Sequence, residues 1–147
     1  MQYLQRVEAA NATVQKFKGK SLKWGSVDCL QIAAHCLNRL GHNKPTSGVR
    51  PYKTASGALR SFREAGYENL IEAVNAYGLI PIAPAMAMAG DIIAYPAINF
   101  GGYGLGIALG DNKMLGLATI PATAQDPEHT LVDVGAIWAA SHAWRAA

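Results

Sequence analysis

The most strongly patterned stretch of the sequence is Ser26-Val27-Asp28-Cys29-Leu30-Gln31-Ile32-Ala33-Ala34-His35-Cys36-Leu37-Asn38-Arg39-Leu40-Gly41. Its apolar residues recur at the 3.6-residue period, which predicts a helix with one continuous buried face. We place Ser26 at the N-cap, Asp28 in the first turn, where a carboxylate suits the helix dipole, and Gly41 at the end. The fold must therefore bury this helix against other elements.

The rest of the chain supplies these elements in a simple order. Three more helices are predicted before residue 80, over Tyr3–Phe17, Ser56–Ala65 and Asn69–Tyr77. After Gly90 the period shortens and predicts strands over Asp91–Tyr95, Gly104–Leu109, Lys113–Leu117, Thr130–Val132 and Ser141–Arg145. Helices first and strands later are typical of an α+β fold, here N-terminal helices packed on a small antiparallel β-sheet.

Length and composition indicate one globular domain over residues 1–147. A chain of 147 residues can bury one core, and 50% hydrophobic with 16% charged residues is ordinary for a globular protein. The uncharged stretches 73–90 and 92–110 are interrupted by Pro and Gly, so we expect no membrane span. The N-terminus has no apolar run, so we expect no signal peptide and synthesis in the cytoplasm.

The charges are divided unevenly along the chain. Residues 1–63 carry eleven Lys or Arg and two acids, a balance of +9, whereas residues 64–147 carry two and eight, a balance of −6. The basic residues are scattered and few aromatic residues accompany them, which does not favour nucleic acid as a partner. Unlike charges in the two halves favour a complementary protein neighbour instead.

Cys29 has two interpretations. A thiol in the first turn of a helix can have a lowered pKa, because the helix dipole stabilises the thiolate, and this is how papain-like enzymes mount their nucleophile. Alternatively, Cys29 is a core residue of its own helix, since free cysteines are among the most buried residues. Cys36 lies about 10 Å further along the helix, beyond the roughly 7 Å that a disulfide spans, and we assign it to the core.

A nucleophilic Cys29 would need a nearby base. His35 lies about 120° around the helix from Cys29, His42 follows its far end, and His129 lies in an acidic loop. His142, in the last predicted strand, is the residue that a sheet could bring to the start of the helix. We favour a half-buried strand residue for His142 and retain it as the base only if the chain is active. The spacings typical of zinc sites are missing, so we expect no metal and no cofactor.

Three segments together resemble the NlpC-type cell-wall peptidases, which are papain-like cysteine amidases. Trp24-Gly25-Ser26-Val27-Asp28-Cys29 is similar to their nucleophile segment, Gly90-Asp91-Ile92-Ile93 to a following strand, and Leu105-Gly106-Ile107-Ala108-Leu109-Gly110 to the strand that carries their catalytic histidine at its head. The resemblance implies a papain-like fold with Cys29 at the nucleophile position.

The whole chain also resembles a small family encoded among phage and prophage tail genes. The shared motifs include a Tyr-x-Thr-x-x-Gly-Ala helix start, here Tyr52–Ala58, and the ending Ala143-Trp144-Arg145. This resemblance implies a virion protein of the tail. The partners that it implies are other tail proteins, further copies of the chain in a homo-oligomer ring, and peptidoglycan.

The departure from the peptidases lies at the base. Their histidine position falls on Gly104, which cannot accept a proton, and we expect Phe100–Gly104 to form a flexible loop there. Three hypotheses follow. The first is a structural component of a bacteriophage tail, at the tail tip, with Cys29 as a vestigial nucleophile. The second is an active peptidoglycan amidase with Cys29 and a histidine base, His142 or His129. The third is a small cytosolic binding protein, for example for nucleic acid, which rests on the basic first half of the chain. We favour the first.

Overall fold

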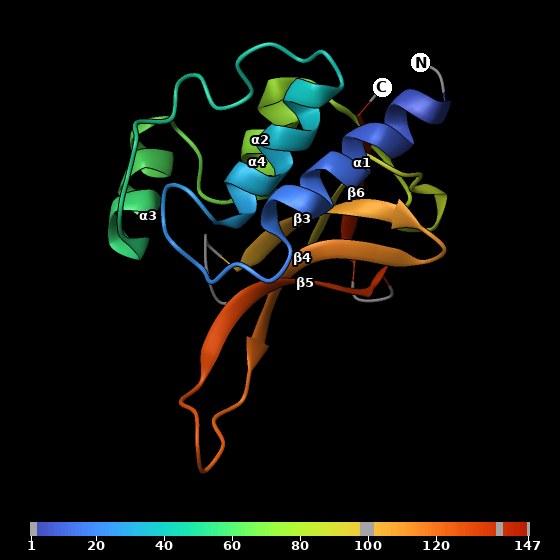
Figure 1. Ribbon diagram of the computed structural model, residues 1–147. Helices are drawn as coiled ribbons and strands as arrows, with labels where there is room; N and C mark the ends of the chain where they lie inside the picture. The colour runs from blue at the N-terminus through green and yellow to red at the C-terminus, as the bar shows by residue number, and fades with distance from the viewer. Residues whose placement is uncertain (1–2, 98–101, 138–139, 147) are drawn as a thin grey trace.

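A six-stranded antiparallel sheet with helices packed on one face forms the body of the protein (Figure 1). The structure is a computed structural model that describes residues 3–97, 102–137 and 140–146. In chain order the elements are α1 (Tyr3–Phe17), α2 (Cys29–Arg39), α3 (Ala55–Glu64), α4 (Leu70–Tyr77), β1 (Ile80–Ile82), the 3₁₀ helix η1 (Pro84–Met86), β2 (Ile92–Pro96), β3 (Tyr103–Gly110), β4 (Lys113–Ile120), β5 (His129–Ala136) and β6 (His142–Arg145). The predicted α+β class is confirmed.

The strands do not lie in sequence order. The sheet order is β1-β6-β2-β3-β4-β5, so the latest strand sits between β1 and β2. In the register, Ile92 of β2 lies opposite Ile107 of β3 on one side and Trp144 of β6 on the other. These three side chains belong to the main core, and each is at most 1% exposed. The centre of the sheet therefore carries the face on which the helices pack.

Helix α2 is the helix that the sequence predicts most clearly, and its apolar stripe is buried as expected. The predicted N-cap, however, was wrong. Asp28 is the N-cap, with an extended backbone and a side chain that accepts a hydrogen bond from the Gln31 backbone N–H. Ser26 instead belongs to the preceding turn, in which its backbone N–H donates to the Lys23 carbonyl. The helix starts at Cys29 because Asp28, not Ser26, satisfies its first free N–H groups.

Other boundaries moved by small amounts, and one strand was missed. Thr54 caps α3, which starts one residue earlier than predicted, and Asn69 caps α4 as expected. Strand β1 was missed because Pro81 lies at its centre and cannot donate to a ladder. Proline is tolerated there because β1 is an edge strand that pairs only with β6.

The C-terminal segment lies in the core, as predicted for Trp144. Its ring is 1% exposed and its Nε1–H donates to the Asn75 side chain at 2.8 Å. The neighbouring Arg145 lies at the rim of the core, in ion-pair contact with the buried Asp91. Trp138, which we also expected in the core, lies outside the described residues. The Ala-Trp-Arg ending therefore works as an anchor for the last strand.

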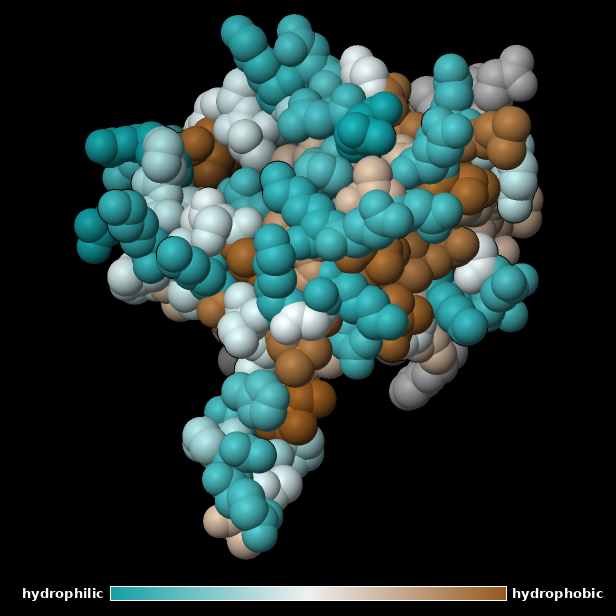
Figure 2. All heavy atoms as spheres, viewed as in Figure 1, coloured by the Kyte–Doolittle hydropathy of each residue, from teal (hydrophilic) through white to brown (hydrophobic). Residues whose placement is uncertain are grey.

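Strands β4 and β5 are longer than predicted and continue beyond the sheet as a hairpin (Figure 1). We call residues 118–131 the arm. Ala118, Thr119 and Ile120 pair with Leu131, Thr130 and His129, and every residue from 121 to 129 is exposed. Figure 2 shows the arm extending from the body with mostly hydrophilic residues along it. The periodicity of the sequence missed this extension because no core imposes an apolar alternation on it.

Candidate functional site

Cys29 occupies the first position of α2, and its position is fixed by the fully buried Asp28. The two carboxylate oxygens of Asp28 accept hydrogen bonds from the backbone N–H groups of Gly25 at 2.8 Å and Gln31 at 3.0 Å, and from the Tyr52 hydroxyl at 3.0 Å. These donors join the turn before α2, the helix itself and the loop before α3. They fix the direction in which α2 starts and therefore where the thiol lies.

Gly25 is required by the close approach of two backbone segments. Its φ is +89°, and a Cβ added to it would overlap the carbonyl oxygen of Tyr52. Two residues after Tyr52, Thr54 caps α3 by accepting a hydrogen bond from the Gly57 N–H at 3.0 Å. The motifs Trp-Gly-x-x-Asp and Tyr-x-Thr-x-x-Gly therefore form one structural unit at the start of two helices.

A groove of about 660 Å³ opens beside Cys29 between the body and the root of the arm. Glu128 is the one charged residue among the described residues that line it. The other lining residues are mostly apolar or small: Leu22, Trp24, Cys29, Ala55, Tyr95, Pro96, Ala97, Gly104, Leu117, Thr119 and Thr130. Cys29 itself is only 1% exposed, so its thiol lies beneath the floor of the groove.

A tyrosine ring covers Gly104, the residue at which the sequence resemblance leads us to expect the histidine of the peptidases. Tyr95 of β2 lies directly opposite Gly104 of β3. A Cβ added to Gly104 would lie 2.8 Å from Cε2 and Cζ of the Tyr95 ring. The Tyr95 hydroxyl accepts a hydrogen bond from the Leu117 backbone N–H on β4 at 3.1 Å, which holds the ring across β3. A larger residue at Gly104 would have to displace this ring.

The prediction of a flexible loop over Phe100–Gly104 was wrong for its last two residues, which belong to β3. Gly104 is buried within β3, where an aromatic ring from the neighbouring strand covers its backbone. Phe100 and Gly101 lie outside the described residues. The strand continues to Tyr103 because pairing with Pro96 and Tyr95 extends the β2–β3 ladder to that point.

The surroundings of Cys29 oppose ionisation of its thiol. Burial, and secondarily the charge of Asp28, raises the pKa of Cys29 to about 12, although a backbone hydrogen bond from Leu105 acts in the opposite direction. Burial also raises the pKa of Tyr95, and a charge on Cys29 would raise it further. Both groups therefore carry their protons at neutral pH. The prediction that Cys29 is a buried thiol is confirmed.

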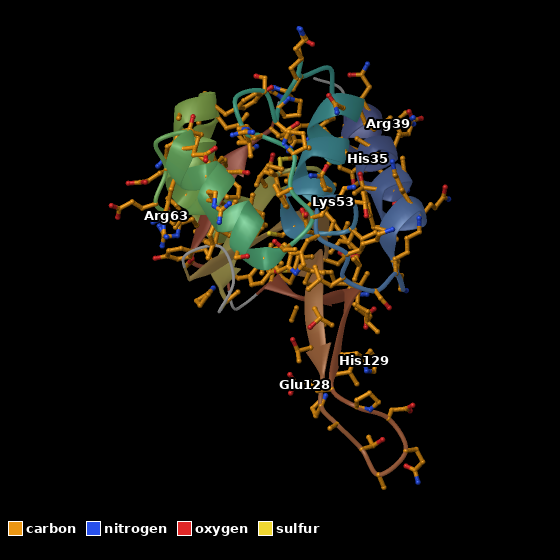
Figure 3. All side chains as sticks on the ribbon, turned by 90° about the vertical axis from the view of Figure 1, so that its left-hand side faces the viewer. His35, Arg39, Lys53, Arg63, Glu128 and His129 are labelled. Atoms are coloured by element: carbon orange, nitrogen blue, oxygen red, sulfur yellow. The ribbon has the colours of Figure 1, made fainter. Side chains whose placement is uncertain are left out.

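Three of the four histidines have hydrogen-bond partners other than Cys29. His35 shares a hydrogen bond of 2.8 Å with Thr13, between α1 and α2. Because the Thr13 hydroxyl donates to the Ala9 carbonyl, Nδ1 of His35 is the donor in this pair. His42 contacts the Ala146 carbonyl, and His129 lies exposed on the arm (Figure 3).

His142 lies on β6, which β2 separates from the Cys29 side of β3. Its ring is stacked on Trp144 and meets Tyr103 edge to face at 5.7 Å, and its Nδ1 shares a hydrogen bond of 2.9 Å with the Ser141 hydroxyl. Two strand spacings correspond to about 10 Å between the β6 and β3 backbones. In the described part of the chain, none of the four imidazoles forms its hydrogen bond with Cys29.

The described residues provide no cluster of metal-ligating side chains. In residues 3–97, 102–137 and 140–146, no group of three or more His, Cys, Asp and Glu side chains could hold a metal ion. Cys29 and Cys36 are both free. Nor does any helix within these ranges have the length and apolarity to cross a membrane.

Sequence reasoning missed the two tyrosines that shape this site. Tyr95 had a usable signal, because pairing of the predicted strands Asp91–Tyr95 and Gly104–Leu109 could place it across from a glycine. An aromatic ring over a cross-strand glycine is a known stabilising arrangement in sheets. Tyr52 had no comparable signal, because its contact with Asp28 depends on how the loop folds back over α2.

Comparison with known proteins gives a family and a fold. The family described as Domain of unknown function (DUF6950) matches residues 3–146. Among solved structures, the NlpC/p60 domain of peptidoglycan hydrolase SagA is similar, with a TM-score of 0.53 and 18% sequence identity over 95% of this chain and 97% of that one. Comparison with curated proteins finds no match. At this identity the likeness shows the fold alone, which is the papain-like fold of NlpC/p60 domains.

Proposed function

The chain belongs to the DUF6950 family, and from this premise we propose that it is a non-hydrolytic NlpC-like domain that serves as a structural component of a bacteriophage tail, at the tail tip. The observation that carries the proposed loss of hydrolysis is the Tyr95 ring over Gly104, the residue to which the sequence resemblance assigns the histidine of the peptidases. This proposal makes Cys29 a vestigial nucleophile and places the chain in the virion.

The chemistry around Cys29 supports the loss of activity. General base catalysis contributes about 10²–10⁴-fold in enzymes, and no imidazole is hydrogen-bonded to Cys29 in the described residues. A pKa of about 12 leaves almost no thiolate at neutral pH. Neither the nucleophile nor its base is therefore prepared for attack on an amide.

The roles of the shared motifs support a structural function. Gly25 and Asp28 fix the start of α2, Asp91 joins the first helix to the last strand, and Trp144 anchors that strand. Each motif that resembles the tail-gene family holds the fold together, and the Cys29 thiol, which one of them places at the groove, keeps its proton because its pKa is raised to about 12. We propose other tail proteins and further copies of the chain as its partners, in contact through its surface.

The first experiment separates this proposal from an active peptidoglycan amidase. Purified protein is incubated with peptidoglycan fragments and the products are analysed by mass spectrometry, with the SagA domain as positive control. We expect no cleavage by the wild type or by Cys29→Ser. Cleavage by the wild type that is lost in Cys29→Ser would establish the amidase instead, and His142→Ala would then test His142 as its base.

The second experiment tests the location. Quantitative mass spectrometry of purified phage particles from a producing strain, compared with the crude lysate, should find the chain enriched with the tail proteins. Cys29→Ser in the phage genome should leave the number of infectious particles unchanged, because serine nearly preserves the volume of the side chain. Recovery of the chain only in the lysate would contradict a virion role.

A further inference from the structure

The arm is an ordered projection whose distal residues are exposed. Its strands are joined by the ladder from Ala118↔Leu131 to Ile120↔His129, and its tip is closed by hydrogen bonds between Thr123 and Asp126. Residues 121–129 are nevertheless all exposed. Two-stranded hairpins are marginally stable in water, and a partner that covers the arm would offset this.

The two ends of the arm carry opposite charges. Asp126 lies in the turn that closes the tip, and Glu128 lies beside His129, part-way along the arm (Figure 3). Neither carboxylate takes part in an ion pair among the described residues. At the root, residues 19–22 run along the outer edge of β5, where the Gly19 N–H donates to the Val132 carbonyl at 2.7 Å and the Leu22 N–H to the Thr130 carbonyl at 2.9 Å. This segment brings exposed lysines to the root, again without an ion pair in the described part of the chain: Lys18, Lys20 and Lys23.

We propose that the arm is a dimerisation element, with which two copies of the chain pair about a two-fold axis. In this arrangement the arms lie antiparallel, so that the acidic tip of each copy meets the lysines at the root of the other. A projection with one charge at its tip and the opposite charge at its root is complementary to itself under this symmetry. The proposal goes beyond the proposed function and does not depend on the chemistry of Cys29.

The arm also offers a small apolar face for such a contact. Ala118 and Leu131 are cross-strand partners, and Ile120 lies two residues along β4, so the three side chains share one face. All three are partly exposed in the single chain. Antiparallel arms would cover these side chains between two rows of ion pairs. This proposal replaces the homo-oligomer ring expected from the resemblance by a dimer, because a two-fold contact between two copies leaves no further copy to be added through the same surface.

Sedimentation velocity of the full chain at low and high salt tests the dimer. We expect a dimer at low salt that dissociates as salt rises, because exposed ion pairs are screened. Asp126→Lys with Glu128→Lys should lose the dimer, and so should Lys18→Glu with Lys20→Glu. A variant with all four changes should regain it, because the charges are exchanged and complementary again. Misfolding cannot produce this rescue.

The matched control exchanges two exposed acids elsewhere, Glu68→Lys with Asp111→Lys, which changes the net charge equally and should leave the dimer intact. A wild type that is monomeric at low salt at every concentration would overturn the proposal. Assemblies larger than dimers would overturn the two-fold geometry, and an exchanged-charge variant that stays monomeric would overturn the assignment of tip to root.

A disulfide experiment tests the same contact by distance. Gln125→Cys protein is mixed with Ser21→Cys protein under mild oxidation, and the cross-linked products are identified by mass. Within one chain, Ser21 lies beside Leu131, and the extended arm carries residue 125 up to about 20 Å further, beyond the reach of a disulfide. We expect the mixed disulfide to dominate. Equal yields from Gln125→Cys alone would contradict the tip-to-root contact.

Discussion

Two aspartates among the described residues are fully buried, Asp28 before α2 and Asp91 before β2, and their carboxylates are stabilised in different ways. Asp28 accepts hydrogen bonds only from uncharged donors, two backbone N–H groups and the Tyr52 hydroxyl. Asp91 forms ion pairs with Arg6 and Arg145, and also accepts hydrogen bonds from the backbone N–H groups of Met88 at 2.9 Å and Ala146 at 3.0 Å.

The two carboxylates differ in how far apart in the sequence the segments that they connect lie. The partners of Asp28 lie within 24 residues of it, whereas Arg6 lies 85 positions before Asp91. The uncompensated charge of Asp28 also lies beside Cys29 and contributes to its raised pKa. The groove end of the molecule is therefore organised around a carboxylate that disfavours a thiolate, and the opposite end around one that joins the extremes of the chain.

The largest effect should come from removing the charge of Asp91. Asp91→Asn leaves Arg6 and most of Arg145 buried without a counter-ion, and breaking a buried ion pair on one side costs about 3–5 kcal/mol. Urea unfolding of the purified variant measures this loss. Asp111→Asn, which changes an exposed carboxylate, is the control and should alter the free energy of unfolding by less than about 0.5 kcal/mol.

The next effect should come from the turn that holds Asp28. Gly25→Ala adds a left-handed strain of about 1–3 kcal/mol and also a clash with the Tyr52 carbonyl. Gly66→Ala is a matched control, because Gly66 has a φ of +95° but nothing within 4 Å of the added Cβ. The difference between the two variants in urea unfolding measures the clash alone. Equal losses would show that the turn moves away freely.

A smaller loss is expected for Asp28→Asn. Asparagine caps helices as well as aspartate, and the surrounding donors are uncharged, so we expect a cost of about 1–3 kcal/mol for the imperfectly matched amide. This variant should therefore be less destabilised than Asp91→Asn in the same urea titration. An equal or greater loss would contradict the contrast between the two carboxylates.

The smallest effect is expected in the rate at which Cys29 is alkylated. In the native wild type, alkylation of Cys29 by iodoacetamide should be very slow at pH 7 and rise only as the pH approaches about 12, because the thiolate forms there. Removing the negative charge in Asp28→Asn favours the thiolate, so its alkylation should rise at lower pH. Peptide mass spectrometry follows the modification. Rapid labelling of the wild type at neutral pH would instead indicate an activated thiolate.

The sequence predicted those parts of the molecule whose cause is local. The stripe on α2 and the Asn69 cap on α4 follow from periodicity and capping chemistry. The choice between Ser26 and Asp28 as the cap of α2 could not be predicted, because both residues cap well and the deciding donors come partly from Tyr52.

Features that depend on pairing between distant segments were harder to predict from the sequence. The assignment of Gly104 to the histidine position of the peptidases stays a prediction, and the Tyr95 ring that covers Gly104 becomes visible only through the register of β2 and β3. The ion pairs of Asp91 had no signal, because a single charged residue does not indicate which of thirteen Lys and Arg side chains it will meet. The arm was shortened in the prediction because its distal residues have no core to pattern them.

The position of β6 between β1 and β2 has a consequence for how the protein is made. During synthesis, β1 and β2 emerge first and must remain apart until β6 arrives and pairs with both. A nascent chain up to β5 therefore exposes two unpaired strand edges, which are prone to association with other chains. The two ion pairs of Asp91 can also form together only after Arg145 has been synthesised, although Arg6 is present from the start. Folding of the sheet should accordingly be complete only after β6 has been synthesised, and it should proceed at the slow rate that is typical of long-range contacts.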